Sequence, residues 1–196
     1  MLTKVLHKIV AQPLIYDAVQ KFFGRAEGHR QMRPFFEETA GCLVVEIGAG
    51  TGDWETVLPP TARYLWYDND ADKLAGFRAK KNSPLAVLAD AANICLKDKS
   101  IDYALCVAVS HHLSDEELDN FLRQLALVCR KKLIFMDAYR HDSLLISNLM
   151  WKYDRGSHPR YPDAILAAIQ KWFDIDRKAE FSVYHRYLIC TGTPQR

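Results

Sequence analysis

A glycine-rich turn after an apolar run is the first feature with chemical meaning. Gly48, Gly50 and Gly52 follow a run that contains Glu46. Glycine reaches positive φ and lets the backbone lie close to a ligand, because it has no Cβ. Trp54 stands near the position where a dinucleotide-binding turn has its third glycine, and no Lys-Ser or Lys-Thr pair follows as in a phosphate-binding loop. The turn therefore favours a ligand without a pyrophosphate.

Two further acids close the next two apolar runs. Asp68 comes sixteen residues after Gly52, and Asp90 ends the third run. Because ligands of doubly wound sheets bind at the carboxyl ends of the strands, Glu46, Asp68 and Asp90 are expected to share one pocket. An acid at Asp68 can accept from ribose hydroxyls, and an acid at Asp90 can accept from an adenine amino group. Each acid alone is equally compatible with a helix cap or a turn, but the ordered set predicts a pocket for a neutral-to-cationic adenosine ligand.

Several segments in this order resemble the class I S-adenosylmethionine (SAM)-dependent methyltransferases. Residues 44–54, VVEIGAGTGDW, are similar to the first motif of that superfamily, and Asp68 falls where the superfamily carries its ribose-binding acid. Residues 89–92 resemble its adenine-contacting segment, and residues 100–113 resemble its fourth strand and the turn that follows. The resemblance covers residues 40–137. It implies methyl transfer with SAM as cofactor and S-adenosylhomocysteine (SAH) as product.

The resemblance also implies which residues bind the cofactor. They are the turn and strand-end residues of its motifs: Glu46, Gly48, Ala49, Gly50, Gly52, Asp68, Asn69, Asp90, Ala91 and Val107. Residues 13–17 and 154–156 further resemble segments of a bacterial subgroup of small methyltransferases. Two segments depart from the family pattern. Trp66-Tyr67 is bulky where Gly-Val is common, and Arg130-Lys131-Lys132 replaces Gly-Gly before the fifth strand.

Two adjacent histidines, His111 and His112, follow the fourth apolar run, where a methyl group would be delivered. Methyl transfer from a sulfonium needs a general base only when the acceptor is protonated at working pH. With an ordinary pKa of about 6.5, a histidine can take that proton. His111 and His112 are thus the candidate catalytic residues, with pocket lining or helix capping as the alternative roles.

Candidate acceptor-binding residues lie on both sides of this core. Residues 151–161 combine arginine, histidine and tyrosine, which suits a carboxylate or phosphate on the acceptor. A structured loop explains the same stretch equally well. A tyrosine near the N-terminus could cover the cofactor or simply pack, and a polar residue after the fifth strand could reach the acceptor. The candidates are Tyr16, Arg140, Arg155 and His158.

The pattern around the fourth and fifth runs narrows the acceptor class. No Asn/Asp-Pro-Pro-Tyr/Phe and no Pro-Cys follows the fourth run, and the formal net charge is only +2, which argues against nucleic acid as partner. Asp137 ends the fifth run without the Asp-Asn pair of a metal-dependent site, so no metal is expected. We expect a small-molecule acceptor. A SAM-binding regulatory or partner protein without turnover, and an RNA or protein methyltransferase, are the alternatives, and the oligomeric state is left open.

Apolar runs of strand length alternate with stretches long enough for crossover helices. This order predicts an α/β fold with a Rossmann-like, doubly wound, seven-stranded sheet that is mostly parallel and ends in an antiparallel hairpin. Ser114 with Glu117 predicts a capping box at the start of the helix that follows His112. The expected strands are Cys42–Ile47, Tyr64–Tyr67, Leu85–Ala89, Tyr103–Val109, Leu133–Met136, Ile175–Val183 and Tyr184–Thr191.

The 196 residues are expected to form a single domain. Within it we expect a helical lid in residues 1–40, a SAM-binding core in 41–140, acceptor-side helices and a loop in 141–173, and a terminal hairpin in 174–196. No apolar run approaches the roughly 20 residues needed to span a bilayer. The five cysteines include no Cys-x-x-Cys pair, which indicates a reducing, cytoplasmic compartment.

Overall fold

In the computed structural model, residues 24–80, 85–142, 158–183 and 185–195 are described. Two of the expected acceptor-binding residues, Tyr16 and Arg155, lie outside the described residues. Their roles, and the lid expected for the first 23 residues of the chain, stay predictions.

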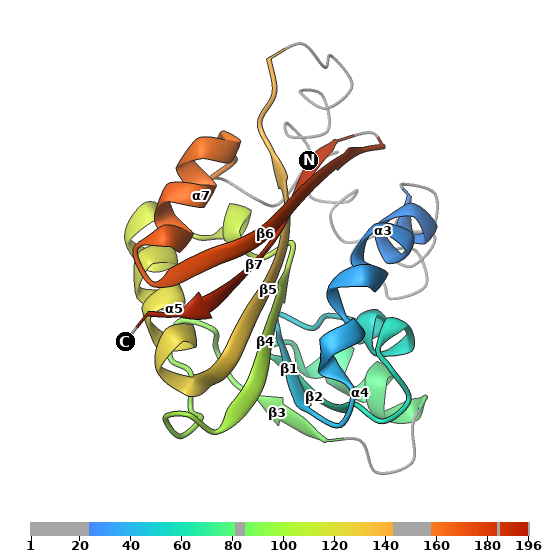
Figure 1. The fold of residues 1–196 in the computed structure, drawn as a ribbon. Coiled ribbons are helices and arrows are strands. Elements are labelled where there is room, and N and C mark those ends of the chain that lie inside the picture. The colour runs from blue at the N-terminus through green and yellow to red at the C-terminus, as the bar shows by residue number, and fades with distance from the viewer. Residues whose placement is uncertain (1–23, 81–84, 143–157, 184, 196) are drawn as a thin grey trace, which may run out of the picture.

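A seven-stranded sheet forms the centre of the fold (Figure 1). Its strand order is β3-β2-β1-β4-β5-β7-β6, so the order reverses between β1 and β4. Strands β1 to β5 pair in parallel, and β7 runs antiparallel between β5 and β6. The predicted mixed sheet with a terminal hairpin is confirmed. The strands are β1 (Leu43–Ile47), β2 (Arg63–Asp68), β3 (Ala86–Leu88), β4 (Ile101–Val107), β5 (Cys129–Tyr139), β6 (Phe173–Ser182) and β7 (Arg186–Pro194).

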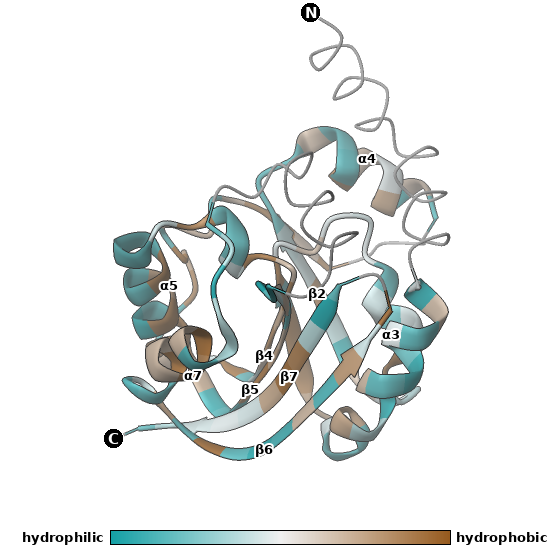
Figure 2. Cartoon of the chain, turned by 90° about the horizontal axis from the view of Figure 1, so that it is seen from above, coloured by the Kyte–Doolittle hydropathy of each residue, from teal (hydrophilic) through white to brown (hydrophobic). Residues whose placement is uncertain are grey.

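Helices cover both faces of this sheet. Figure 2 shows α5 and α7 on one side of the strands and α3 on the other. Along β1 the buried residues alternate between the faces: Val45 and Ile47 pack in the core under α5 and α7, whereas Val44 packs in the core on the α3 side. Such two-sided burial is typical of a parallel strand in the middle of a sheet. The helices are α3 (Arg25–Met32), α4 (Ala71–Ala79), α5 (Asp115–Val128) and α7 (Pro162–Gln170).

The region between α3 and β1 is a layer of the core. Short 3-10 helices η1 (Arg33–Phe35) and η2 (Glu37–Thr39) continue from α3. Met32 and Phe36 are almost fully buried against the sheet. Residues 25–39, which were expected to belong to a lid, therefore cover one face of the sheet. A covering role over the site remains a prediction for the residues before them.

Helix α5 begins with the predicted capping box, in which Ser114 Oγ accepts from the Glu117 backbone and the Glu117 carboxylate accepts from Ser114. The helix ends at Val128, and β5 starts at the next residue. The fifth strand is thus longer at both ends than the expected Leu133–Met136. Because helix and strand join directly, no Gly-Gly turn is needed there, which accounts for the Arg130-Lys131-Lys132 departure.

Candidate active site

The glycine turn is held by backbone hydrogen bonds from β1 to β2. Gly48 N and Ala49 N both donate to the carbonyl of Tyr67, at 2.8 and 3.1 Å. Gly52 N donates to the carbonyl of Ala49 at 2.8 Å and closes the turn. The three glycines have φ values of +74°, +53° and +72° in sequence order. These left-handed values explain why the turn needs glycine.

The three glycines differ in what a side chain would meet. A Cβ on Gly48 would lie 2.5 Å from Cγ2 of Val109, and a Cβ on Gly52 would lie 2.5 Å from Cδ2 of Phe77. A Cβ on Gly50 would meet no atom of the described residues within 4 Å. Gly48 and Gly52 are therefore required by the fold itself, whereas the middle glycine leaves open space beside the backbone. A ligand can approach the chain there.

Asp68 lies at the end of β2 beside this open space. It is buried, with one carboxylate oxygen accepting from Gly50 N at 2.8 Å and the other from Asp70 N at 3.0 Å. Each carboxylate oxygen can accept more than one hydrogen bond. Asp68 therefore fixes the middle of the glycine turn and keeps accepting capacity for hydroxyl groups.

The bulky pair before Asp68 has a defined role in this structure. Trp66 Nε1 donates to the carbonyl of Gly50 at 2.9 Å. The Trp66 ring stacks on the ring of Phe77, with 6.0 Å between the ring centroids. On the other face of β2, the Tyr67 hydroxyl lies 3.2 Å from the carbonyls of both Asp90 and Asn93. Burial, the largest cause, raises the pKa of Tyr67 to about 12, so this hydroxyl keeps its proton. The two aromatic residues thus brace the turn and the segment after β3.

The segment after β3 carries Asp90, the residue that is expected to contact adenine. Asp90 is exposed, and its Oδ1 accepts from Ala92 N at 2.9 Å. From α5, Gln124 donates to the carbonyl of Ala92 and accepts from Ile94 N, both at 2.8 Å. Two other predicted cofactor residues adjoin these acids in the sequence: Asn69 follows Asp68 and is exposed, and Ala91 follows Asp90 and is half-buried.

Glu46 occupies a different environment from the other two acids. It is almost fully buried, and the Tyr64 hydroxyl donates a short hydrogen bond to its carboxylate. Burial raises the pKa of Glu46 well above its usual range, against the opposing effect of the Tyr64 hydrogen bond. The charges of Asp53 and Asp68 raise it further. Glu46 is therefore braced inside the fold beneath the turn.

Beyond β4, the chain makes an unusual turn that presents the two histidines. Ala108 has a φ of +54°, which is rare for a residue with a side chain, and β4 ends before it at Val107. The turn continues as the 3-10 helix η4 (Ser110–His112). His111 is buried and His112 is exposed, with ring centroids 4.2 Å apart.

Asp137 of β5 binds this turn from the side. His111 Nδ1 lies 2.6 Å from Oδ1 of Asp137, and Ser110 Oγ donates to Oδ2 at 2.5 Å. Burial alone would raise the pKa of Asp137, but the charge of His111 and the hydrogen bonds from His111, Ser110 and Ala138 outweigh it and lower that pKa. The site therefore contains a buried Asp–His pair next to the end of β4.

Comparison with known proteins completes this description. A family model described as a methyltransferase domain matches residues 44–132, which include the glycine turn, Asp68, Asp90 and the histidine turn. A search of curated proteins finds no match. The family-model match identifies a methyltransferase domain in the chain. The chain is therefore a methyltransferase.

Solved structures support the fold of this methyltransferase. Magnesium protoporphyrin IX methyltransferase from Synechocystis PCC 6803, with bound SAH, has a TM-score of 0.76 and 18% identity, covering 98% of this chain and 100% of that chain. The PH0226 protein from Pyrococcus horikoshii OT3 has a TM-score of 0.74 and 13% identity, covering 90% and 92%. The YcgJ protein from Bacillus subtilis has a TM-score of 0.70 and 12% identity, covering 87% and 99%. At these identities the likeness concerns the fold.

The acceptor side of the methyltransferase is tied together by Arg160. Its guanidinium donates to the carbonyls of Ser110 and Leu113, both at 2.7 Å, and pairs with Asp115. The backbone of His158 donates to the carbonyl of His111 at 3.0 Å, while its side chain is exposed. The predicted acceptor residue His158 thus lies directly beside the histidine turn.

Arg140, the other described candidate for acceptor binding, follows the end of β5. Its backbone donates to the carbonyl of Arg160 at 2.7 Å, and its exposed guanidinium lies 5.5 Å from the ring centroid of Tyr161. The structure brings Arg140 and His158 to the same edge of the sheet. The Arg160 guanidinium is instead occupied by the turn that it holds.

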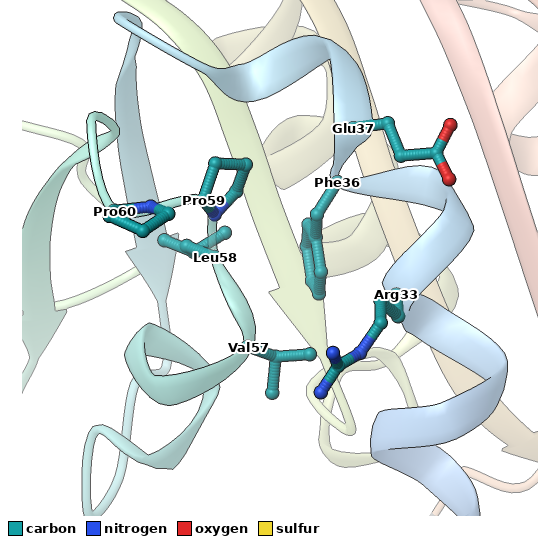
Figure 3. Close-up of a pocket in the computed structure, with 7 residues that line it drawn as sticks. All are labelled: Arg33, Phe36, Glu37, Val57, Leu58, Pro59 and Pro60. Carbon is teal, nitrogen blue, oxygen red and sulfur yellow. The ribbon is translucent and has the colours of Figure 1, made fainter.

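A cavity of about 220 Å³ lies elsewhere, between η1 and the segment after η3 (Asp53–Val57) (Figure 3). Phe36 is turned toward Val57 and Leu58, whereas the carboxylate of Glu37 points away. No predicted site residue lines this cavity, so it is separate from the cofactor turn. Its lining residues are Arg33, Phe36, Glu37, Val57, Leu58, Pro59 and Pro60.

Among the described residues, no group of three or more histidine, cysteine, aspartate or glutamate side chains is arranged to hold a metal ion. In the same part of the chain, no helix is both long and apolar enough to cross a bilayer.

Sequence reasoning missed three residues that organise the site. Asp137 was considered only as a metal ligand, yet it binds the histidine turn. Arg160 was grouped with acceptor-binding residues, yet it holds backbone carbonyls. Tyr67 stood out only as a departure from the family pattern. The one available signal was that Asp137 ends the fifth apolar run, as His111 follows the fourth, so that both stand at the carboxyl ends of strands.

Proposed function

We propose that this methyltransferase transfers the methyl group of SAM to a small-molecule acceptor. The observation that carries the proposal is the open space beside Gly50 with Asp68 at its edge. A ligand can lie against the backbone there, and a buried carboxylate is ready to accept its hydroxyl groups. When bound, SAM supplies a methyl group activated by a positively charged sulfur.

The residues around this space have separate tasks in the proposal. Gly48, Ala49, Gly50 and Gly52 shape the backbone against the cofactor, with Val107 at the end of β4 beside them. Asp68 and Asn69 face its ribose, and Asp90 and Ala91 face its adenine. Glu46 supports the turn from below through Tyr64. Rate acceleration comes mainly from holding the acceptor in line with the methyl group.

A small molecule as acceptor is supported by the composition of the chain. The net charge of +2 provides no basic track for a nucleic acid. Arg140 and His158, together with Tyr16 and Arg155, are proposed to contact the acceptor, and His111 and His112 are the candidates for proton transfer. A cytoplasmic location is part of the proposal, supported by five cysteines that are all free thiols.

Calorimetric titration of SAM and SAH into the wild-type protein tests the proposal. We expect binding of both ligands, and we expect Asp68→Ala to weaken SAH binding. Losing hydrogen bonds to a charged group costs about 1.5–3 kcal/mol, which is roughly a tenfold to hundredfold loss of affinity.

The matched control is Asp70→Ala, because Asp70 caps α4 by accepting from Asp72 N and Lys73 N. This variant lowers stability but should bind SAH normally. Absence of SAM and SAH binding by the wild type would contradict the proposal. Binding without methyl transfer to any component of a metabolite extract would instead favour a regulatory protein.

A further inference from the structure

We propose that Asp137 is a positioning residue that holds His111 as the proton acceptor of the reaction, so that the methyl acceptor carries a protic hydroxyl or amine group. The inference rests on the proposed function and deepens it. It selects His111 over His112, and it narrows the acceptor from any oxygen, nitrogen or carbon to a group that must lose a proton.

The first argument is the environment of Asp137. Its carboxylate is buried, with 1% of the residue exposed. Besides the His111 ring and the Ser110 hydroxyl, it accepts from the backbone of Ala138 at 2.8 Å and of His111 at 3.3 Å. A buried carboxylate with so many donors stays ionised and has little freedom to move. Asp137 therefore acts as a fixed negative charge.

The second argument is what this charge does to the imidazole. With Nδ1 of His111 directed at the carboxylate at 2.6 Å, the Nδ1 proton is donated to Asp137, and Nε2 becomes the proton-accepting atom of the neutral ring. The negative charge also stabilises the imidazolium that forms when Nε2 takes a proton. This is the arrangement expected of a general base, and a residue that only lined a pocket would not need it.

The third argument is the position of the pair between the two binding regions. Val109, two residues before His111, lies directly against Gly48 of the cofactor turn. On the other side, the backbone of His158 binds the carbonyl of His111. His111 thus lies between the cofactor turn and the segment that carries the acceptor candidates. His112, by contrast, is exposed beside it.

The charged and titratable groups near His111 come from several elements. Asp137 faces it from β5, His112 from its own turn, and the Arg160 guanidinium from the segment before α7, 2.7 Å from the Ser110 carbonyl. Cys106 of β4 stays neutral, because burial, and then the charge of Asp137, raise the pKa of its thiol well above the usual range. Of these, Asp137 is the anion that touches the ring.

The proposed step balances in atoms and charge. The lone pair of the acceptor oxygen or nitrogen forms the bond to the methyl carbon. The carbon–sulfur bond breaks, and its electron pair neutralises the positive sulfur, which leaves as part of SAH. The proton of the acceptor moves to Nε2 of His111, and solvent removes it afterwards.

The direct test is the tautomer and pKa of His111, measured by ¹⁵N NMR of histidine-labelled protein, both free and with SAH added. We expect the Nδ1-protonated tautomer, with an imidazolium pKa above 6.5. Asp137→Asn should lower that pKa and shift the tautomer toward Nε2–H. A wild-type His111 protonated at Nε2 in its neutral form would overturn the inference, and this result needs no variant to fold.

The matched control is Asp102→Asn. Asp102 lies near the amino end of β4, far from the histidine turn at the carboxyl end. There it accepts a hydrogen bond from Leu43 N and pairs with Arg130. This variant should leave the His111 tautomer and pKa unchanged. SAH affinity should be unchanged in both variants. If the wild type fails to bind SAH, the proposed function is contradicted, whereas the NMR spectrum of the free protein still tests the inference.

The second test uses [methyl-³H]SAM and a metabolite extract, with the labelled product identified by mass spectrometry. We expect an O-methyl or N-methyl product, and a kcat/KM that rises with pH as His111 loses its proton. Asp137→Asn should lower the kcat/KM reached at high pH by about 10²- to 10⁴-fold. It should also move the rise of kcat/KM to lower pH, because the lost anion no longer stabilises the imidazolium. A C-methyl or sulfonium product would overturn the inference, and so would a rise of kcat/KM at the same pH in the variant and the wild type.

Discussion

The cofactor side and the acceptor side of this site are built in different ways. On the cofactor side, main-chain donors of Gly48, Ala49 and Gly52 hold the turn at the ends of β1 and β2. On the acceptor side, the turn after β4 is held largely by side chains far away in the sequence, namely Asp137 and Arg160. The first construction depends on where glycines stand, and the second depends on which side chains reach across the fold.

This difference separates what each side tolerates. A backbone-held turn keeps its shape under most substitutions but fails when a Cβ enters the wrong place. A turn held by two side chains can be loosened by one truncation while the cofactor side remains intact. Stability, cofactor affinity and methyl transfer are therefore expected to respond separately to the variants below.

The largest expected effect is that of Arg160→Ala. The guanidinium is only 9% exposed and donates to two carbonyls at 2.7 Å, and hydrogen bonds to a charged group contribute about 1.5–3 kcal/mol. We expect the free energy of unfolding, measured in urea, to fall by about 3 kcal/mol, while SAH affinity in calorimetry stays within about threefold of the wild type.

Arg130→Ala is the control for Arg160. Arg130 pairs with Asp102 but is 48% exposed, so its loss should cost no more than about 1 kcal/mol. If Arg160→Ala weakened SAH binding as much as it weakened stability, the two sides would not be independent.

A smaller effect is expected from Gly50→Ala. The new methyl group enters the space proposed for the cofactor, and such overpacking costs about 1–3 kcal/mol, which corresponds to a roughly 5- to 150-fold loss of SAH affinity. Gly41→Ala is matched to it, since Gly41 also has a positive φ, of +71°, and its Cβ would likewise meet nothing within 4 Å.

Both glycine variants should lose similar stability from backbone strain, and only Gly50→Ala should lose SAH affinity. Thermal unfolding and calorimetry measure the two quantities. Equal SAH affinity in the two variants would mean that the space beside Gly50 is not the cofactor space.

The smallest effect is expected from Tyr67→Phe. The lost hydroxyl joins β2 to the segment that carries Asp90, and a neutral hydrogen bond contributes about 0.5–1.5 kcal/mol. SAH affinity should fall roughly two- to tenfold. Tyr103→Phe removes a comparable hydrogen bond, which the Tyr103 hydroxyl donates to the Glu38 carbonyl at 3.1 Å. Because Tyr103 lies near the amino end of β4, this variant should leave SAH affinity unchanged. Equal losses would contradict the bracing role of Tyr67.

The sequence predicted the mostly parallel sheet, the terminal hairpin, the α5 capping box and the glycine turn, because each depends on a local pattern. Hydrophobic runs indicate strands, and a turn with left-handed φ values is indicated by the glycines that it favours. The pairing of His111 with Asp137 links residues 26 positions apart, and that of Arg160 with Ser110 links residues 50 positions apart. Such contacts depend on the packed fold, and no spacing rule predicts them.

The misjudged details have the same origin. Residues 25–39 were expected to belong to a helical lid, and only the fold shows that they cover one face of the sheet. The expected Leu133–Met136 strand was too short because Lys131 and Lys132 are charged. In the structure Lys132 Nζ lies 2.9 Å from a carboxylate oxygen of both Glu38 and Asp176, so Lys132 continues the strand with its charge paired.

The contact between Gly48 and Val109 limits how this chain can change over evolutionary time. A side chain at position 48 would occupy the place of the Val109 methyl group, so the two positions cannot vary independently. A residue other than glycine at position 48 would need both a left-handed backbone and a smaller residue 109, and the second change alters the turn that carries His111. The glycine turn and the histidine turn are thus coupled through one van der Waals contact.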